Sequence, residues 1–349
     1  MQNGQSCVST GRLAGIDLVK VVAILGVLMI HISAGGLQTP GGITGNWFGA
    51  LFWGSISRAS VPLFFLCSGA MMLDPNREYP LKKLFGHNLL HILAALFCWA
   101  LAYRAYHLWA EGAWTAAAVV QAGKDVLLFR HEFHLYYLHI IIMVYLWLPV
   151  TRLIVRSATK RELEYLLALW LLFGIFYPTA RQFWPLNLLK GIPLQYAINM
   201  TYSAIGYGVA GYYLRTWPPC RRTAQLMAGV GLMIVFGGTA WLSIRQGALA
   251  TALLEGMSPG AALYALGLFG WLVSVRPAKP DVVRQISGAS FCVYLVHMFW
   301  VYLLQALGFS VQRLPYLVSI PLLVLAVFVL SFVTWLVLRR IPGVRRWLI

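Results

Sequence analysis

The stretch 16-IDLVKVVAILGVLMIH-31 decides the fold of this chain, because it is an apolar run with a cation near one end and an imidazole at the other. Lys20 and His31 are eleven residues apart, almost three helical turns, so both side chains are expected on one face of one helix. Their separation along that helix is roughly 16 Å, about half the hydrocarbon thickness of a bilayer. Ionisable residues inside a membrane span are costly and usually mark function. The pair therefore predicts a polar track through a bundle of membrane-spanning helices.

The rest of the chain has the composition of a polytopic membrane protein. Of its 349 residues, 60% are hydrophobic and only 11% are charged. A soluble domain of this size could not bury so many apolar side chains. The connections between the apolar runs are short, so we expect one integral-membrane domain over residues 1–349. No small-residue cleavage site follows the first run, which is expected to stay as a span rather than act as a signal peptide.

Apolar stretches bounded by charges or by Pro and Gly clusters predict an all-α fold with about ten transmembrane helices. The fifth and eighth stretches are short, so these two helices are expected to be tilted or broken. The predicted helices cover residues 14–34, 47–73, 86–109, 134–155, 163–178, 196–214, 224–244, 260–275, 288–308 and 317–338.

The distribution of Lys and Arg predicts the orientation of these helices. With a cytoplasmic N-terminus, the inner segments hold 18 of the 27 basic residues and the outer loops hold six. The positive-inside rule then places both termini in the cytoplasm. The net charge of +17 is explained by this topology and by contact with anionic lipids. Nucleic-acid binding is not expected, because no basic stripe with interleaved aromatic residues is present. The inner basic residues are Arg12, Arg77, Lys82, Lys83, Arg152, Arg156, Lys160, Arg161, Arg215, Arg221, Arg222, Arg276, Lys279, Arg284, Arg339, Arg340, Arg345 and Arg346.

The remaining three basic residues, Lys20, Arg58 and Arg104, fall inside predicted spans. Asp17 lies three residues before Lys20, so the two can form a local ion pair or belong to one site near the inner end. Arg58 is expected at about the height of His31, where a guanidinium can bind an anion, stabilise an oxyanion, or reach the outer headgroups. His31 itself is either a functional group or an interfacial imidazole bonded to a loop. Arg104 has no motif around it and is expected to extend toward the membrane surface.

Small residues on the second span add to the predicted track. Ser68 and Gly69 lie near the inner end, level with Lys20, and they allow close approach by a ligand or by another helix. Pro62 removes a helical hydrogen bond and is expected to kink the span.

The start of the fourth span is rich in His and Tyr. His134, Tyr136 and Tyr137 could line the mouth of a sugar site or form an interfacial aromatic belt. A metal site is not predicted, because His134 and His139 are five residues apart rather than four and no carboxylate completes a ligand set.

On the ninth span, Ser290, Tyr294 and His297 follow i, i+4, i+7 spacing and share one helix face. A Tyr and a His at this depth are expected to face the interior of the bundle, as substrate contacts or as hydrogen-bonded structural residues.

Four of these stretches together resemble the acyltransferase-3 family of bacterial integral-membrane acyltransferases, in particular its short members similar to the enterobacterial common antigen O-acetyltransferase. Two departures are visible: Lys20 stands where the family commonly has Arg, and Tyr136 stands where it has Trp. The four stretches are IDxxK with His eleven residues after the Lys (Asp17 to His31), SRxSVPLFFxxSG (Ser57 to Gly69), HLYY leading to YLxxP (His134 to Pro149) and ISxxSxxxYxxH (Ile286 to His297).

The resemblance implies a multi-pass enzyme of the bacterial inner membrane that transfers an acyl group, usually acetyl from acetyl-CoA, to a glycan hydroxyl. No metal cofactor is predicted. The expected partners are acyl-CoA, a glycan or lipid-linked glycan and membrane lipids, and a homo-oligomer is left open. The residues sort into His31 and Arg58 for catalysis, Asp17, Lys20, Ser68 and Gly69 for the acyl-donor tunnel, and His134, Tyr136, Tyr137, Tyr294 and His297 for the acceptor or the surroundings of the site.

Two roles for His31 follow from the resemblance and stay open at this stage: a general base toward the acceptor hydroxyl, or a transient carrier of the acyl group. The alternative class of protein is a transporter or flippase for a glycan or a small anionic solute, because ten spans with buried charges suit a carrier. No self-similarity between the two halves supports it. A purely structural subunit gives no reason for Lys20, Arg58 and His31 at matched depths.

Overall fold

The computed structural model describes residues 14–39 and 42–349, and over these ranges the chain is helical without any strand. Arg12, which the sequence assigns to the inner side, lies outside the described residues. The predicted all-α membrane fold is confirmed, because eight helical stretches among the described residues are long and apolar enough to cross a bilayer. The elements are α1 (Ala14–Leu37), α2 (Gly45–Ile56), η1 (Ser57–Ala59), α3 (Ser60–Met72), α4 (Leu81–Lys83), η2 (Leu84–Leu89), α5 (Leu90–Ala110), α6 (Ala116–Leu127), η3 (Phe133–Leu135), α7 (Tyr136–Ser157), α8 (Lys160–Trp170), η4 (Leu171–Phe176), α9 (Tyr177–Ala180), η5 (Leu186–Leu188), η6 (Ile192–Tyr196), α10 (Met200–Thr216), α11 (Arg221–Met233), η7 (Ile234–Gly238), α12 (Thr239–Gln246), α13 (Pro259–Leu272), α14 (Pro280–Ala306), η8 (Val311–Arg313), α15 (Tyr316–Leu338) and α16 (Pro342–Trp347).

Each of the ten predicted helices has a counterpart in the structure. Eight are the long stretches, and the other two are α10, with 17 residues, and α13, with 14. The expectation that the eighth helix is short is confirmed by α13. For the fifth it is wrong: α8, η4 and α9 form one stretch of 21 residues, Lys160–Ala180, in which η4 is π-helical. Helix α6, which has 12 residues and lies between the third and fourth spans, was not predicted.

Helix starts are set by ordinary capping residues. The Thr44 hydroxyl accepts a hydrogen bond from the backbone N–H of Trp47 at the start of α2. Thr159 and Glu162 form a capping box at α8. Ser258 caps α13, with Pro259 as its first residue. These side chains satisfy backbone N–H groups that have no partner within the helix, which fixes where each helix begins.

Pro62 explains why the second span is interrupted. A proline in a helix lacks its own N–H and its ring clashes with the carbonyl four residues earlier, which here belongs to Arg58. The chain responds with a 3₁₀ turn, η1, between α2 and α3. Arg58 is the central residue of that turn, so a single proline determines the local backbone that carries a predicted site residue.

Glycines bring the inner halves of the helices into close contact. A Cβ atom on Gly69 of α3 would lie 1.8 Å from the carbonyl oxygen of Gly208 on α10. A Cβ on Gly211 would lie 2.0 Å from the carbonyl oxygen of Leu66. Because lipid offers no hydrophobic force between helices, such close backbone packing holds membrane bundles together.

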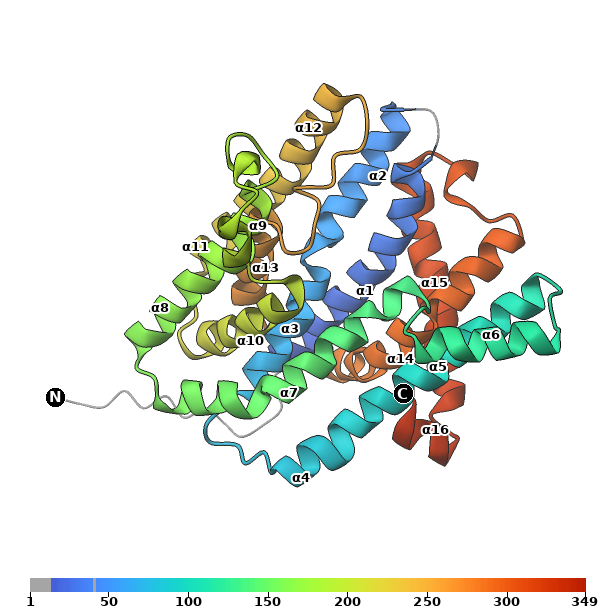
Figure 1. Cartoon of the computed structure of the whole chain (residues 1–349), viewed down its shortest axis with the longest axis horizontal. Coiled ribbons are helices and arrows are strands. Elements are labelled where there is room, and N and C mark those ends of the chain that lie inside the picture. Colours follow the sequence, from blue (N-terminus) through green and yellow to red (C-terminus); the bar gives the residue numbers. More distant parts are fainter. Residues whose placement is uncertain (1–13, 40–41) are drawn as a thin grey trace.

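Figure 1 shows α1 at the centre of the bundle, with α8 to α13 on one side and α5, α6, α14 and α15 on the other. The segments predicted to be cytoplasmic after α3, α7 and α10 meet at one end, where Arg152 and Arg215 both contact the segment around Asp74. At the other end, the Gln312 side-chain amide donates to the Thr39 hydroxyl beyond α1. These contacts agree with the grouping of helix ends that the charge pattern predicts. The assignment of one end to the cytoplasm stays a prediction, and inner and outer below name the predicted sides.

Candidate active site

A cavity of about 860 Å³ runs along α1 between α3, α7 and α14. Its lining on α1 extends from Lys20 to Leu37, which corresponds to about 26 Å at 1.5 Å per residue. His31 lies on the same stripe, nearer the outer end. The predicted polar track is therefore an open space and not only a row of side chains on a helix.

Eight of the eleven predicted site residues line this cavity, and three do not. The eight come from α1, the α2–α3 span, the η3–α7 segment and α14. Asp17, Gly69 and His297 lie outside the lining, each with a packing role described below. The lining residues are Lys20, His31, Arg58, Ser68, His134, Tyr136, Tyr137 and Tyr294.

Three imidazole rings meet at the outer part of the cavity. The ring centroid of His31 lies 5.1 Å from that of His297 and 6.3 Å from that of His134. The centroids of His134 and His297 are 5.2 Å apart, and Phe133 closes the other side of His31 at 5.3 Å. The rings come from α1, η3 and α14, so residues more than a hundred positions apart converge on His31.

The hydrogen bond of His297 determines its tautomer. Its Nδ1 lies 2.6 Å from the carbonyl oxygen of Tyr294, and because a carbonyl only accepts, Nδ1 carries the proton. In neutral His297 the other nitrogen, Nε2, is then an acceptor, and it is buried without a hydrogen-bond partner among the described residues. A lone pair is thus held in the ring that packs against His31.

His134 is fixed through its backbone rather than its ring. The Tyr294 hydroxyl donates to the carbonyl oxygen of His134 across 2.6 Å, while Tyr103 packs edge-on against the imidazole at 5.0 Å. The His134 ring is 1% exposed, and neither of its nitrogens bonds to any described residue. Buried polar atoms are normally satisfied, so unpaired ones facing a cavity indicate a place where a ligand supplies the partner.

Arg58 reaches the same region from the 3₁₀ turn η1. Its Nε is buried and has no hydrogen-bond partner within the described chain. Tyr136 and Glu255 interact with it electrostatically, and both also line the cavity. A guanidinium held with free donors next to an imidazole cluster can accept an oxyanion or a carboxylate.

The loop between α12 and α13 covers the outer end of the cavity and was not anticipated. Leu249, Thr251 and Glu255 belong to it, and Glu255 is exposed at the mouth. A signal was present in the sequence, since Glu255 is one of only ten acidic residues and lies in a predicted outer loop. Without the fold, nothing connects that loop to Arg58.

Tyr137 forms part of the wall between the two ends. Its ring lies 5.3 Å from Phe65 and 5.4 Å from Tyr294. At the inner end, the Ser68 hydroxyl donates back to the Phe64 carbonyl oxygen at 2.9 Å, on the lining beside Lys20. The wall is aromatic at mid-depth and small or cationic at the inner end.

The predicted donor residues Asp17 and Gly69 have packing contacts. Asp17 is 5% exposed and accepts a hydrogen bond of 2.6 Å from the Ser287 hydroxyl, which ties α1 to α14. Gly69 lies against Gly208, as described above, and is not part of the cavity lining.

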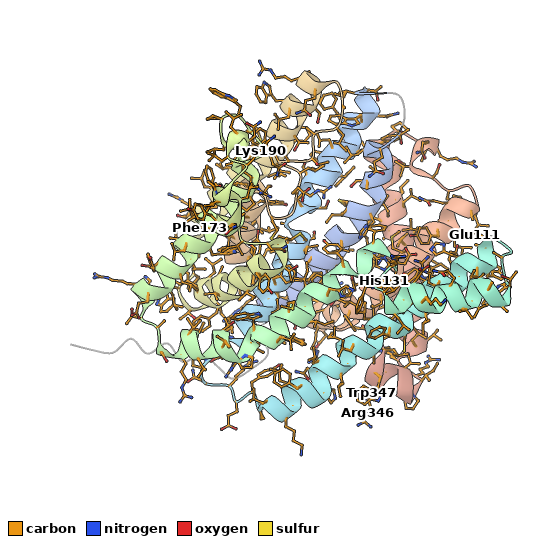
Figure 2. The ribbon with its side chains drawn as sticks, viewed as in Figure 1. Glu111, His131, Phe173, Lys190, Arg346 and Trp347 are labelled. Atoms are coloured by element: carbon orange, nitrogen blue, oxygen red, sulfur yellow. The ribbon has the colours of Figure 1, made fainter. Side chains whose placement is uncertain are left out.

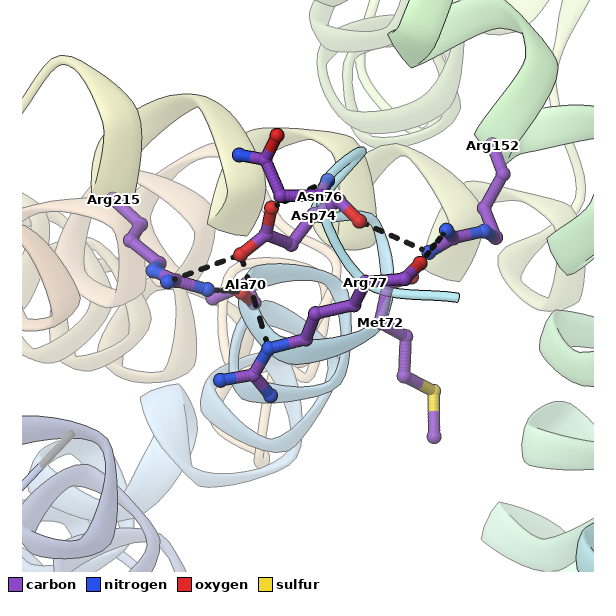
Figure 3. Close-up of polar contacts among 7 residues, drawn as sticks. All are labelled: Ala70, Met72, Asp74, Asn76, Arg77, Arg152 and Arg215. Carbon is purple, nitrogen blue, oxygen red and sulfur yellow. Dashed lines mark hydrogen bonds and ion pairs between the residues drawn. The ribbon is translucent and has the colours of Figure 1, made fainter. Parts of the chain in front are cut away.

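A network of arginines closes the inner end of α3, as Figure 3 shows. Arg152 donates to the backbone carbonyls of Met72, Asp74 and Arg77. Arg215 donates to the Ala70 carbonyl, and its Nη2 lies 3.3 Å from the Asp74 carboxylate. Since Met72 lines the cavity, this network, which we call the inner clamp (Asp74, Arg77, Arg152 and Arg215), holds its inner edge.

Groups of possible metal ligands are absent from the described residues. Within residues 14–39 and 42–349, no three His, Cys, Asp or Glu side chains are grouped so that they could hold a metal ion.

Comparison with known proteins identifies a family. The model of the acyltransferase-3 family, described as an acyltransferase domain, matches residues 13–339. Neither the curated proteins nor the solved structures include a significant match. The matched range contains every residue of the cavity lining.

Proposed function

The chain belongs to the acyltransferase-3 family of membrane acyltransferases, and from this we propose that it moves an acetyl group from acetyl-CoA, bound from the cytoplasmic side, to a hydroxyl of a cell-surface glycan or glycolipid precursor. The observation that carries the proposal is the cavity that joins Lys20 at one end to His31 and Arg58 at the other. A donor entering at one end and an acceptor at the other could meet inside it.

The proposed position of the donor rests on the charge at the inner end of the cavity and on the distance from Lys20 to His31. Lys20 and Ser68 offer a cation and a hydroxyl at the inner end, where the phosphates of CoA would remain at the membrane boundary. The rise from Lys20 to His31 is roughly 16 Å along α1, which is of the order of an extended pantetheine arm. The thioester would then lie beside His31.

His31 is the proposed base. Its free nitrogen takes the proton of the acceptor hydroxyl while that oxygen attacks the thioester carbonyl carbon. The carbon–sulfur bond then breaks, the acyl group stays on the acceptor oxygen, and the proton passes from His31 to the departing CoA sulfur. The ring of His297 packs beside His31 and holds an acceptor lone pair, so it can orient the His31 ring and stabilise its protonated form.

Arg58 is the proposed electrostatic partner of the reaction. The carbonyl oxygen of the thioester gains negative charge as the acceptor attacks, and a guanidinium with an unpaired buried donor among the described residues can stabilise it. The turn η1 sets the guanidinium in place before substrate binds, so little reorganisation is needed.

The outer mouth suits a hydroxylated acceptor. Glu255 and Tyr136 present a carboxylate and a phenol at the rim, and the aromatic ring of Phe133 lies beside His31. Sugars are bound by such combinations of hydrogen-bonding groups and ring faces. The resemblance to short members of the family that act on a surface polysaccharide supports a glycan acceptor, and we propose the bacterial inner membrane as the site of action.

A turnover assay with a matched histidine control tests the proposal. Purified protein in lipid is given radiolabelled acetyl-CoA and a lipid-linked glycan, and CoA thiol release and labelled glycan are measured. His31→Ala is expected to lower turnover by about 10²- to 10⁴-fold. His139→Ala serves as control, because that ring stacks on His131 outside the cavity lining.

The same assay separates two routes. Label that stays on the protein when acceptor is omitted would identify an acyl-histidine intermediate, whereas label found only on glycan supports direct transfer. Turnover that survives in His31→Ala at the wild-type rate would remove His31 from the mechanism. Ion or solute flux without any thioester loss would point instead to a carrier.

A further inference from the structure

A second cavity, of about 580 Å³, lies where α15 ends, and within the described residues it shares no lining residue with the first. Its lining is strongly basic and contains no acidic side chain. Besides one proline, this basic pocket is formed by Arg339, Arg340, Arg345, Arg346, His87 and His91.

The pocket exists because the chain folds back after α15. Pro342 starts the short helix α16, which lies beside α5. The Trp99 indole N–H of α5 donates to the Leu348 carbonyl oxygen at 2.9 Å, and the Trp347 ring stacks on His87 with centroids 6.0 Å apart. Figure 2 shows Arg346 and Trp347 together at this edge of the molecule. Two independent contacts therefore hold the basic segment, one against α5 and one against η2.

The positive charges in the pocket are not neutralised. None of its four arginines forms an ion pair with a carboxylate in the part of the chain that the structure describes. Arg339 lies over the Trp335 ring at 4.5 Å and Arg346 over the Trp347 ring at 5.3 Å, which fixes the direction of two guanidinium groups. The remaining two, Arg340 and Arg345, have no such contact with any described residue and are available to a ligand.

His91 adds an unpaired nitrogen to the basic pocket. Nε2 of His91 is buried and bonds to no described residue, although the ring lines the pocket. Several guanidinium groups with fork-shaped donors, together with imidazole nitrogens, match the tetrahedral oxygens of a phosphate group.

We propose that the basic pocket binds the phosphate of an anionic phospholipid headgroup. The surface next to it favours a lipid over a soluble phosphate. Val337 and Ile341, on either side of Arg339 and Arg340, are 55% and 48% exposed, and Leu90, beside His91, is 48% exposed. These apolar side chains lie next to the pocket residues on α5, on α15 and just before α16, where they can contact acyl chains while the arginines hold the headgroup.

A soluble source of phosphate is the competing assignment. His91 packs edge-on against Phe291 at 5.5 Å, and Phe291 lines the first cavity. The pocket is therefore one side chain away from the proposed donor path, so the phosphates of CoA could reach it. The test must separate these two sources, and it does not depend on the proposed reaction.

The experiment measures binding of fluorescent phosphatidylglycerol to the purified full chain in phosphatidylcholine micelles. Arg340→Gln with Arg345→Gln removes two positive charges without removing the aromatic contacts of the pocket. The expected result is binding weakened at least about tenfold, since each basic residue near an anionic headgroup contributes on the order of 1 kcal/mol. The matched control is Arg221→Gln with Arg222→Gln, two exposed arginines that begin α11 at the same predicted membrane face.

Three results would overturn the proposal. Equal weakening by the control pair would mean that general surface charge attracts the lipid. Binding of phosphatidylcholine as tight as that of phosphatidylglycerol would exclude recognition of the anionic headgroup. Displacement of the fluorescent lipid by micromolar 3′,5′-ADP or inorganic pyrophosphate would assign the pocket to a soluble phosphate. Melting curves in pure phosphatidylcholine check that all variants are folded.

Discussion

The two ends of the cavity differ in whether their polar side chains have hydrogen-bond partners within the described chain. At the inner end, the guanidinium groups of Arg152 and Arg215 are occupied by backbone carbonyls and by Asp74. At the outer end, nitrogens of Arg58, His134 and His297 are buried without a hydrogen-bond partner in the described chain. An unsatisfied buried polar atom costs on the order of 1–3 kcal/mol, so a fold keeps several in one place only when something else uses them.

This difference separates residues that stabilise the fold from residues proposed to take part in the reaction. The inner clamp uses charge to fix the segment after α3 and has little capacity left for a ligand. In the outer cluster, Arg58 and His134 line the cavity with nitrogens that have no partner in the described chain. Substitutions in the outer cluster should therefore change turnover and leave folding intact, and substitutions in the inner clamp should do the reverse.

After His31, the largest effect is expected at Arg58. Arg58→Ala should lower kcat by about 10²- to 10³-fold, because it removes a donor aimed at the developing oxyanion. Arg58→Lys keeps the charge but loses the planar fork, so it should recover only part of the rate. The measurement is steady-state CoA release at saturating donor. A variant that raised KM alone, with kcat intact, would place Arg58 in substrate binding instead of transition-state stabilisation.

The next effect concerns stability and compares two glycines. Gly69→Ala would put a methyl group 1.8 Å from the Gly208 carbonyl oxygen, so the backbones must separate. The expected loss is about 3 kcal/mol in the free energy of unfolding. In Gly208→Ala the nearest atom is Gly69 Cα at 3.8 Å, an ordinary contact, so this matched variant should be close to wild type.

Unfolding in mixed micelles measures both glycine variants. If Gly69→Ala unfolded like wild type but bound acyl-CoA poorly, Gly69 would belong to the donor path, as the sequence had suggested, and not to helix packing.

A smaller loss of stability is expected at the inner clamp. Arg215 and Asp74 have side chains that are 10% and 15% exposed, so their ion pair and the bond to Ala70 are shielded from water. Arg215→Ala should lower the free energy of unfolding by about 2 kcal/mol. Turnover per folded molecule should stay near the wild-type value. A collapse of turnover in a variant with normal stability would show that the clamp takes part in the reaction.

The smallest effect is expected at Lys20. Lys20→Met should raise KM for acetyl-CoA by about tenfold, equivalent to about 1.4 kcal/mol of binding, and leave kcat nearly unchanged. Lys82→Met is the control for general charge, because Lys82 is exposed at the same predicted side and does not line the cavity. If both variants weakened donor binding equally, Lys20 would have no specific role there.

The helices were largely predictable because their signals are local. Runs of apolar residues near 20 in length identify spans whatever their neighbours are, and the loop arginines group the ends. The fifth span was underestimated because Arg161 and Glu162 start the helix before its apolar part does. Helix α6 was not predicted because it is short and carries polar residues such as Lys124 and Asp125.

The site was predictable only where its residues belong to a recognisable pattern. His31 and Arg58 stand in motifs, and their depths follow from counting along two helices. The contact of His31 with His134 and His297 depends on how three separate helices cross, which no local pattern contains. Glu255 lies in a loop whose position over Arg58 is set by the packing of α13.

The most direct test of the contrast between the two ends is turnover per folded molecule in His31→Ala and Arg215→Ala, measured side by side with their melting temperatures. We predict that His31→Ala melts like wild type and loses about 10²- to 10⁴-fold in turnover. Arg215→Ala should melt earlier and keep its turnover. Wild-type turnover in folded His31→Ala would contradict the account, because the outer imidazole cluster would then have no part in acyl transfer.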